Sequence, residues 1–277
     1  MITTDAAPGS PCWLDLGAPD VRAAAAFYGA VLGWEYQPMG DGGDGGDEGE
    51  AGDGESPEGG VLKKDGKTVA GLGTLTEEGA RSAWMLYFAV TDADATTEAV
   101  RRAGGSVRVA PRDLGEWGRM AQYSDPLGGQ FAAWQPGADT GFELADAPGS
   151  LSWTELCTTD ARAAKEFYGA VFGWSYSDMN LPGGGGPYHL ITPAGLAEDR
   201  MQGGVIEIGE ENLSLTGGRP YWHPVFAVTD CDAAVAEVTR NGGSVRMGPQ
   251  DAEGVGRLAV CLDPSNAEFV LLTPSEN

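Results

Sequence analysis

The feature that most constrains this chain of 277 residues is an internal repeat. Residues 11–36 and 151–176 share 14 of 26 positions at an offset of 140. Further matches follow at an offset of 138, namely FAVTD at 88–92 and 226–230, and GGSVR at 104–108 and 242–246. Because so many matches occur in the same order, we interpret the chain as a duplicated domain.

The repeat divides the chain into two domains. We expect domain 1 at 1–137 and domain 2 at 150–277, with the Gly-, Ala- and Asp-rich segment 138–149 as a polar linker. Residues 40–56 interrupt the first copy and contain 8 Gly and 7 acidic residues. This composition predicts a disordered surface loop. Calcium binding is the alternative, but the spacing of the acidic residues does not match an EF-hand loop.

The hydrophobic pattern predicts the same elements in both copies. Leu14 and Leu16 alternate with Trp13 and Asp15, which indicates a strand with two different faces. A helix follows, with Asp20 as its N-cap and a glycine at its end. Further strands are expected at 84–90, 106–110, 119–124 and 130–135, with a second helix between the first two. Each copy therefore uses a βαβββ module twice, which is an α+β fold.

Composition limits the class of protein. The formal net charge of −24 argues against a nucleic-acid partner or docking on an anionic membrane. The four cysteines have neither the spacing of a zinc site nor the density of a disulfide scaffold. No apolar run reaches the roughly 18 residues of a membrane span. Residues 1–10 lack the pattern of a secretory signal. We therefore expect a soluble cytoplasmic protein.

Several motifs together resemble one known superfamily. The pattern D-x-R-A-A-x-x-F-Y-G-A-V-x-G-W occurs at 20–34 and 160–174, and FAVTD, GGSV and an Asp-Pro turn follow in each copy. This resembles the vicinal oxygen chelate superfamily of glyoxalases, bleomycin-resistance proteins and extradiol dioxygenases, especially its tandem two-domain actinobacterial members. The resemblance implies curved mixed sheets, built from paired modules, around a cleft. It leaves function open, because this fold hosts both enzymes and drug-binding proteins.

The resemblance also implies where metal ligands would lie, on the first, fifth and last strands of a copy. Those positions are Trp13, Met85 and Ala132 in the first copy and Trp153, His223 and Val270 in the second. A metal centre needs several converging His or carboxylate ligands, and only one of these six residues is suitable. We therefore expect neither a metal nor another cofactor.

An unusual ligand set in the second copy remains an alternative. Glu155 and Glu268 share the strand parity of the missing ligands, so both could face the cleft with His223. Each is displaced by two residues, roughly 7 Å along a strand. We interpret His223 as a hydrogen-bonded cleft or core residue.

Strand parity also predicts the residues that line the two clefts. The expected ligand-binding residues are Trp13, Asp15, Met85, Tyr87, Trp134, Trp153, Glu155, Tyr221, His223 and Glu268. Aromatic and methionine side chains suit a flat aromatic ligand, and the carboxylates suit an amine on that ligand. The alternative is that the aromatic side chains only fill the space between the sheets.

The residues favour a binding protein over an enzyme. Our hypothesis is a metal-free protein of bleomycin-resistance type that sequesters an aromatic antibiotic or metabolite, with or without a cationic amine, in self-resistance or antibiotic biosynthesis. The alternative is a glyoxalase-like lyase, isomerase or oxygenase in domain 2, with His223 and Glu155 as candidate acid–base residues. As an accessory protein, the binding protein would have a tailoring enzyme as a candidate partner. A third option is a protein-interaction module that uses the acidic loop or the sheet surface. We expect a monomer with paired domains or a weak homodimer.

Overall fold

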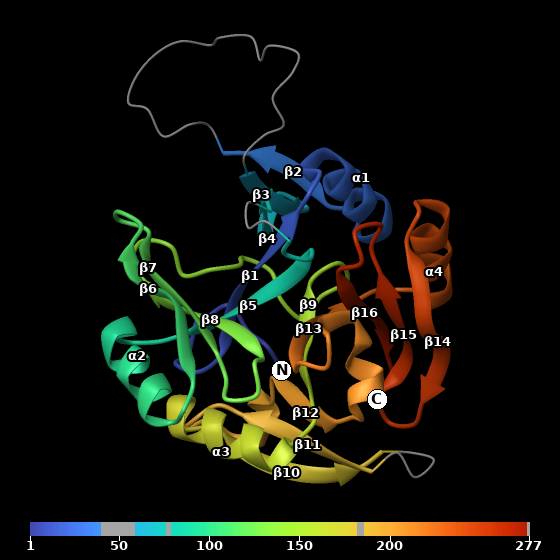
Figure 1. The fold of residues 1–277 in the computed structure, drawn as a ribbon. Coiled ribbons are helices and arrows are strands. Elements are labelled where there is room, and N and C mark those ends of the chain that lie inside the picture. The colour runs from blue at the N-terminus through green and yellow to red at the C-terminus, as the bar shows by residue number, and fades with distance from the viewer. Residues whose placement is uncertain (40–58, 76–78, 182–185, 276–277) are drawn as a thin grey trace, which may run out of the picture.

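Each copy of the repeat forms one eight-stranded mixed sheet with two long helices, so the chain is an α+β protein of two tandem domains (Figure 1). This is a computed structural model that describes residues 1–39, 59–75, 79–181 and 186–275. The segment 40–56, which we predict to be a disordered loop, lies outside the described residues. No helix in the described part of the chain is both long and apolar enough to cross a membrane.

The elements follow the βαβββ order twice in each copy. The first copy contains β1 (Pro11–Ala18), α1 (Val21–Leu32), β2 (Glu35–Pro38), β3 (Gly59–Lys64), β4 (Lys67–Thr74), β5 (Ala83–Ala89), α2 (Ala93–Arg102), β6 (Ser106–Asp113), β7 (Gly118–Ser124) and β8 (Gln130–Pro136). The second contains β9 (Leu151–Thr158), α3 (Ala161–Phe172), β10 (Ser175–Asn180), β11 (Pro187–Thr192), β12 (Gly203–Glu207), β13 (Tyr221–Ala227), α4 (Cys231–Arg240), β14 (Ser244–Ala252), β15 (Gly256–Leu262) and β16 (Glu268–Pro274). Two short 3₁₀ helices, η2 (Glu198–Arg200) and η3 (Glu210–Thr216), precede β12 and β13.

The two modules of a copy join through their first strands. The strand order is β2-β3-β4-β1-β5-β8-β7-β6 in the first sheet and β10-β11-β12-β9-β13-β16-β15-β14 in the second. β1 pairs antiparallel with β5, whereas β1 with β4 and β5 with β8 are parallel pairs. The side chains of β1, β5 and β8 that share one face are therefore neighbours at the centre of the sheet.

Local sequence sets the helix ends as predicted. The Asp20 carboxylate accepts a hydrogen bond from Ala23 N at 2.9 Å and so caps α1. Gly33 ends α1 with a φ of 71°, a left-handed conformation that glycine adopts without steric cost. Asp92 caps α2 in the same way as Asp20 caps α1.

The two faces of the first sheet bury different sets of side chains, as strand parity predicts. One face contributes Leu14, Leu16, Trp84, Leu86, Phe88 and Phe131 to the main core. The other contributes Cys12, Tyr87, Ala89, Met120, Ala132 and Trp134 to a small second cluster. Tyr87 and Trp134 are only 5% and 7% exposed, so this end of the first cleft is filled by protein side chains.

The two copies share the main core. The ring of Phe27 on α1 packs edge-on against Phe269 on β16, with 6.1 Å between centroids. The pseudo-symmetric helix α3 packs in the same way against the first sheet, where Tyr168 meets Phe131 at 5.2 Å. Figure 1 shows the resulting pairs, α1 beside α4 and α2 beside α3. One continuous set of buried residues therefore spans both copies.

Hydrogen bonds between the copies involve the repeated motif residues. The hydroxyl of Tyr28 accepts from Trp84 Nε1 at 3.1 Å and donates to Asp263 of the second copy at 3.2 Å. The matching hydroxyl, that of Tyr168, donates to Asp125 of the first copy at 3.1 Å. In each copy, the helix that contains the Phe-Tyr-Gly motif is thus hydrogen-bonded to the Asp-Pro turn of the other copy. All the groups involved are buried, where an unpaired polar group is costly.

The segment between the copies is packed against both of them. Phe142 is only 2% exposed and belongs to the main core. The indole of Trp134 donates to the backbone oxygen of Asp139 at 2.9 Å, and the indole of Trp34 donates to that of Gly149 at 2.7 Å. The segment that we interpret as a polar linker is therefore ordered by apolar and hydrogen-bonded contacts.

Candidate functional site

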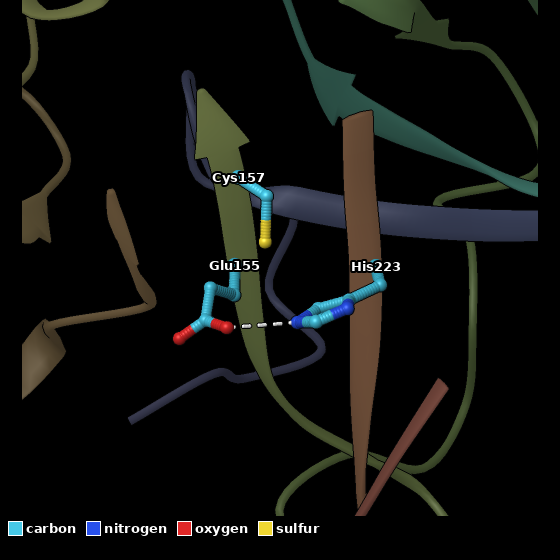
Figure 2. A group of neighbouring side chains, drawn as sticks. All are labelled: Glu155, Cys157 and His223. Carbon is cyan, nitrogen blue, oxygen red and sulfur yellow. Dashed lines mark hydrogen bonds and ion pairs between the residues drawn. The ribbon is translucent and has the colours of Figure 1, made fainter. Parts of the chain in front are cut away.

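The second copy contains a buried histidine held between two carboxylates. His223 lies on β13 opposite Glu155 on β9, because these strands pair antiparallel in that register. His223 Nε2 is 2.9 Å from Glu155 Oε2, and His223 Nδ1 is 2.9 Å from Glu268 Oε1 at the start of β16. The histidine is 2% exposed, which confirms its interpretation as a hydrogen-bonded interior residue. Figure 2 shows Glu155 and His223 pointing toward each other from neighbouring strands.

Further donors extend this arrangement at both ends. The Tyr221 hydroxyl donates to Glu268 Oε1 at 2.5 Å, and Arg246 Nη1 donates to Glu268 Oε2 at 3.3 Å. At the other end, the indole of Trp153 donates to the Tyr188 hydroxyl at 2.9 Å, which in turn hydrogen-bonds to Glu155. We call the seven residues Trp153, Tyr188, Glu155, His223, Glu268, Tyr221 and Arg246 the histidine network.

The electrostatics of the histidine network favour a charged imidazole. Burial alone would lower the pKa of His223, but its hydrogen bonds to Glu155 and Glu268 outweigh burial and raise the pKa to about 9. Burial likewise acts to raise the pKa of each glutamate, and the interaction with His223 lowers it below the ordinary value. At neutral pH the network therefore holds an imidazolium between two carboxylates.

The equivalent place in the first copy has different chemistry. Asp15 lies opposite Met85, and Gln130 occupies the position of Glu268. The Tyr87 hydroxyl donates to Asp15 Oδ2 at 2.6 Å. Burial raises the pKa of Asp15 to about 6 despite this bond. The first copy therefore has a single carboxylate beside a methionine, and no histidine.

A cleft of about 520 Å³ lies beside this carboxylate and receives residues from both copies. Asp15, Met85 and Gln130 line it from the first sheet. Pro220 and Tyr221 line it from the second copy, where the chain enters β13. The cleft thus lies between the two domains, and neither copy forms it alone.

The structure places the predicted site residues in four different surroundings. Trp153, Glu155, Tyr221, His223 and Glu268 meet in the histidine network, and Asp15 and Met85 line the cleft. Trp13 is half-buried and packs beside Gly71 of β4. Tyr87 and Trp134 belong to the small buried cluster of the first sheet. Because β9 and β13 pair Glu155 with His223, the two-residue displacement expected from sequence does not keep these groups apart.

Sequence reasoning missed the arginines near these sites. Arg246 contacts Glu268, and Arg81, Arg108 and Arg219 line the cleft. One signal was available, because Arg108 and Arg246 end the two copies of GGSVR. Arg81 and Arg219 lie in connecting segments, where no periodic pattern assigns a side chain to a face.

Comparison with known proteins agrees with this architecture. A model described as Glyoxalase/Bleomycin resistance protein/Dioxygenase superfamily matches residues 150–271, and a model described as Glyoxalase-like domain matches residues 13–134. The anthracycline biosynthesis protein DnrV of Streptomyces peucetius is 39% identical over 95% of this chain and 92% of that protein. The chain belongs to the glyoxalase/bleomycin resistance/dioxygenase superfamily.

Other members of the superfamily show how widely its functions vary. The putative glyoxylase CFP32 of Mycobacterium tuberculosis is 34% identical over 96% of this chain and 95% of that protein. Among solved structures, the Mn(II)-bound glyoxalase of Novosphingobium aromaticivorans has a TM-score of 0.61 at 17% identity, with 97% of this chain and 84% of that chain covered. The 2,3-dioxygenase LapB of Pseudomonas sp. KL28 has a TM-score of 0.62 at 14% identity, with 97% and 94% covered. At such low identity the two structures support the fold alone.

The residues of the second copy do not fit the metal that enzymes of this superfamily hold. Among the described residues, Glu155, Cys157 and His223 bring potential ligand atoms within 4.8 Å of one another (Figure 2). A ligating histidine needs a free lone pair, but both ring nitrogens of His223 are already hydrogen-bonded to carboxylates at 2.9 Å. Burial raises the pKa of the Cys157 thiol, which disfavours the thiolate that metals bind. The network fits a proton on His223 better than a divalent cation.

Proposed function

We propose that this protein binds an aromatic small molecule in the cleft between its domains and serves as an accessory protein in antibiotic biosynthesis. The cleft carries the proposal. Its volume of about 520 Å³ suits a drug-sized ligand, and its lining offers apolar surfaces at Leu75, Met85 and Pro220 among a larger number of polar and charged groups. Two curated relatives, 39% and 38% identical, are named anthracycline biosynthesis proteins, which supports a polycyclic aromatic ligand.

The contacts in the cleft suit binding without chemistry on the ligand. Met85 and Pro220 offer soft and flat apolar surfaces on which an aromatic ring can lie. Asp15 offers a hydrogen-bond acceptor for a hydroxyl or an amine, oriented by Tyr87. We propose that binding requires no metal and sequesters the ligand in the manner of bleomycin-resistance proteins.

The test is a titration with an anthracycline. Binding is monitored by quenching of the fluorescence of the 8 tryptophans and, separately, by calorimetry. Ala83 lines the cleft from β5 and is exposed, so Ala83→Trp should fill the site without disturbing the core. We expect saturable binding by the wild type and a loss of affinity of about tenfold or more in this variant. Ala110→Trp, on an exposed position of β6 outside the cleft lining, is the matched control and should bind normally. Equal affinity in all three proteins would place the ligand elsewhere.

The histidine network favours a second candidate function. A buried histidine between two carboxylates can transfer a proton, so acid–base chemistry in domain 2, as in a glyoxalase-like lyase or isomerase, is the alternative. Native mass spectrometry with elemental analysis, on the wild type and on His223→Ala, separates the two functions. Stoichiometric metal that disappears in the variant would favour the enzyme, and an aromatic ligand retained by both proteins would favour the binding protein.

A further inference from the structure

Three arginines gather at the cleft of a strongly acidic protein. The chain has 17 Lys+Arg against 41 Asp+Glu, yet Arg81, Arg108 and Arg219 all line this one cavity. Arg81 precedes β5 and Arg108 lies on β6, both in the first copy, whereas Arg219 precedes β13 in the second. Both domains thus contribute positively charged side chains to the cleft, although the chain as a whole is strongly negative.

Two of these guanidinium groups are held by neutral partners. Arg81 Nη1 donates to the backbone oxygen of Asn266 at 3.0 Å, and Arg219 Nε donates to that of Thr216 at 3.1 Å. Within the described ranges of the chain, neither arginine lies within 4.0 Å of a carboxylate oxygen. Backbone carbonyls orient a guanidinium but do not neutralise it, so both arginines keep a full positive charge at the cleft.

The carboxylate of Glu268, which also lines the cleft, is already engaged. Tyr221 and His223 occupy its Oε1 atom, and Arg246 occupies Oε2. Its hydrogen bonds are therefore all made inside the histidine network, and it attracts Arg81 only through space, without an ion pair. Asp15 is the other carboxylate among the described lining residues, so Arg81 and Arg219 together leave the cleft with an excess of positive charge that an incoming ligand can balance.

We propose that the aromatic ligand carries an anionic oxygen group, a carboxylate or an ionised phenol, which binds between Arg81 and Arg219. This inference rests on the proposed function and names the class of its ligand. The guanidinium fork matches such a group with charge-assisted hydrogen bonds. Met85 and Pro220 line the same cavity and contact the ring. Because the two arginines come from different copies, the bound anion bridges the domains.

The experiment compares three anthraquinone probes by calorimetry on the full chain: one with a 2-carboxylate, one with a neutral 2-hydroxymethyl group and one with a 2-aminomethyl group. We expect the carboxylate to bind about tenfold or more tightly than the neutral probe, an advantage that added salt should reduce. The double variant with Arg81→Gln and Arg219→Gln should lose this advantage, whereas its affinity for the neutral probe should stay the same. Arg219→Gln alone, on an exposed residue, should remove part of it, which guards against misfolding of the double variant.

The matched control is Arg22→Gln with Arg102→Gln, which changes the net charge equally at two exposed helix positions outside the cleft. This control should retain the preference for the carboxylate. Equal affinity for carboxylate and neutral probes, or tighter binding of the amine, would overturn the inference and leave the aromatic site intact. If none of the three probes binds, the proposed function itself fails.

Discussion

At the scale of single residues, His223 determines how the second copy responds to pH. Its folded pKa of about 9 lies above the ordinary value of 6.5, so its contribution to stability is complete below pH 6.5 and is lost as the pH rises through 9. The lowered pKa values of Glu155 and Glu268 act in the opposite sense, because their contribution is lost as the pH falls through the folded values. The network should therefore stabilise the fold most in mildly acidic solution.

We predict that the free energy of unfolding of the wild type falls by roughly 3 kcal/mol between pH 6 and pH 9.5 because His223 loses its proton. Urea denaturation at a series of pH values measures this. His223→Gln should be less stable at pH 6 and should lose most of the pH dependence. His189→Gln is the control, because His189 pairs with the exposed Asp178 outside the network. A wild-type stability that does not change across this range would mean that His223 is neutral.

The residue scale also shows how far sequence reasoning reached in the candidate site. Strand parity assigned Glu155, His223 and Glu268 to one face, because side chains alternate strictly along a strand. Parity does not give the register between strands, and the register decides that Glu155 rather than Trp153 lies opposite His223. Sequence reasoning could not predict Arg81 and Arg219, because only tertiary contacts determine where a side chain of a connecting segment lies.

At the scale of secondary-structure elements, the repeated FYG helix joins the two copies. Tyr28 on α1 and Tyr168 on α3 each donate to a buried aspartate of the opposite copy. The sequence predicted these helices, their caps and their order in the modules, since all of these depend on local spacing. It did not predict that each helix also contacts the sheet of the other copy, because the same amphipathic pattern would suit either sheet.

We predict that Tyr28→Phe lowers the free energy of unfolding by about 1–3 kcal/mol, because Asp263 and Trp84 each lose a buried hydrogen-bond partner. Chemical denaturation followed by both tryptophan fluorescence and far-UV circular dichroism provides the measurement. Tyr36→Phe is the matched control, because the Tyr36 hydroxyl is buried without a partner among the described residues. Equal effects of the two substitutions would show that the bond between the copies contributes nothing measurable.

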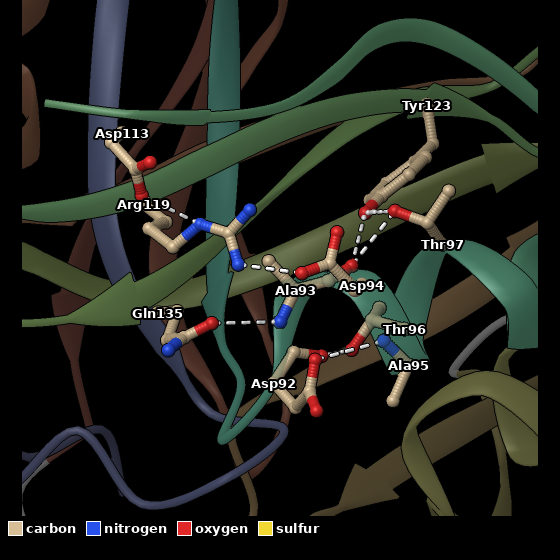
Figure 3. A network of polar contacts seen from close by, with 10 residues as sticks. All are labelled: Asp92, Ala93, Asp94, Ala95, Thr96, Thr97, Asp113, Arg119, Tyr123 and Gln135. Carbon is tan, nitrogen blue, oxygen red and sulfur yellow. Dashed lines mark hydrogen bonds and ion pairs between the residues drawn. The ribbon is translucent and has the colours of Figure 1, made fainter.

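Polar contacts also connect the first turn of α2 to the neighbouring strands, as Figure 3 shows. Ala93 N donates to Gln135 Oε1 at 2.9 Å, and Arg119 pairs with Asp94 at 2.6 Å, so β7 and β8 are fixed to the first turn of the helix. Arg257 and Asp232 form the corresponding pair in the second copy. These contacts position α2 and α4 against their sheets, and none of them involves a residue that lines the cleft.

At the scale of the whole molecule, duplication has produced two unequal sites on one shared core. The second copy keeps a histidine but fills its site with the side chains of its own network. The first copy has no histidine but borders a cleft that the second copy helps to form. The duplication was evident from sequence, whereas this division of roles was not, because it depends on how the copies pack together.

The central claim is that an aromatic ligand binds in the cleft between the domains. The most direct test is methyl NMR of the 7 methionines during titration with an anthracycline. The cleft predicts a large, saturable shift of the Met85 signal from the ring current of the ligand, with little change at the exposed Met247 on β14. Saturable shifts that spare Met85 and occur at other methionines, or no shift at all, would contradict the account.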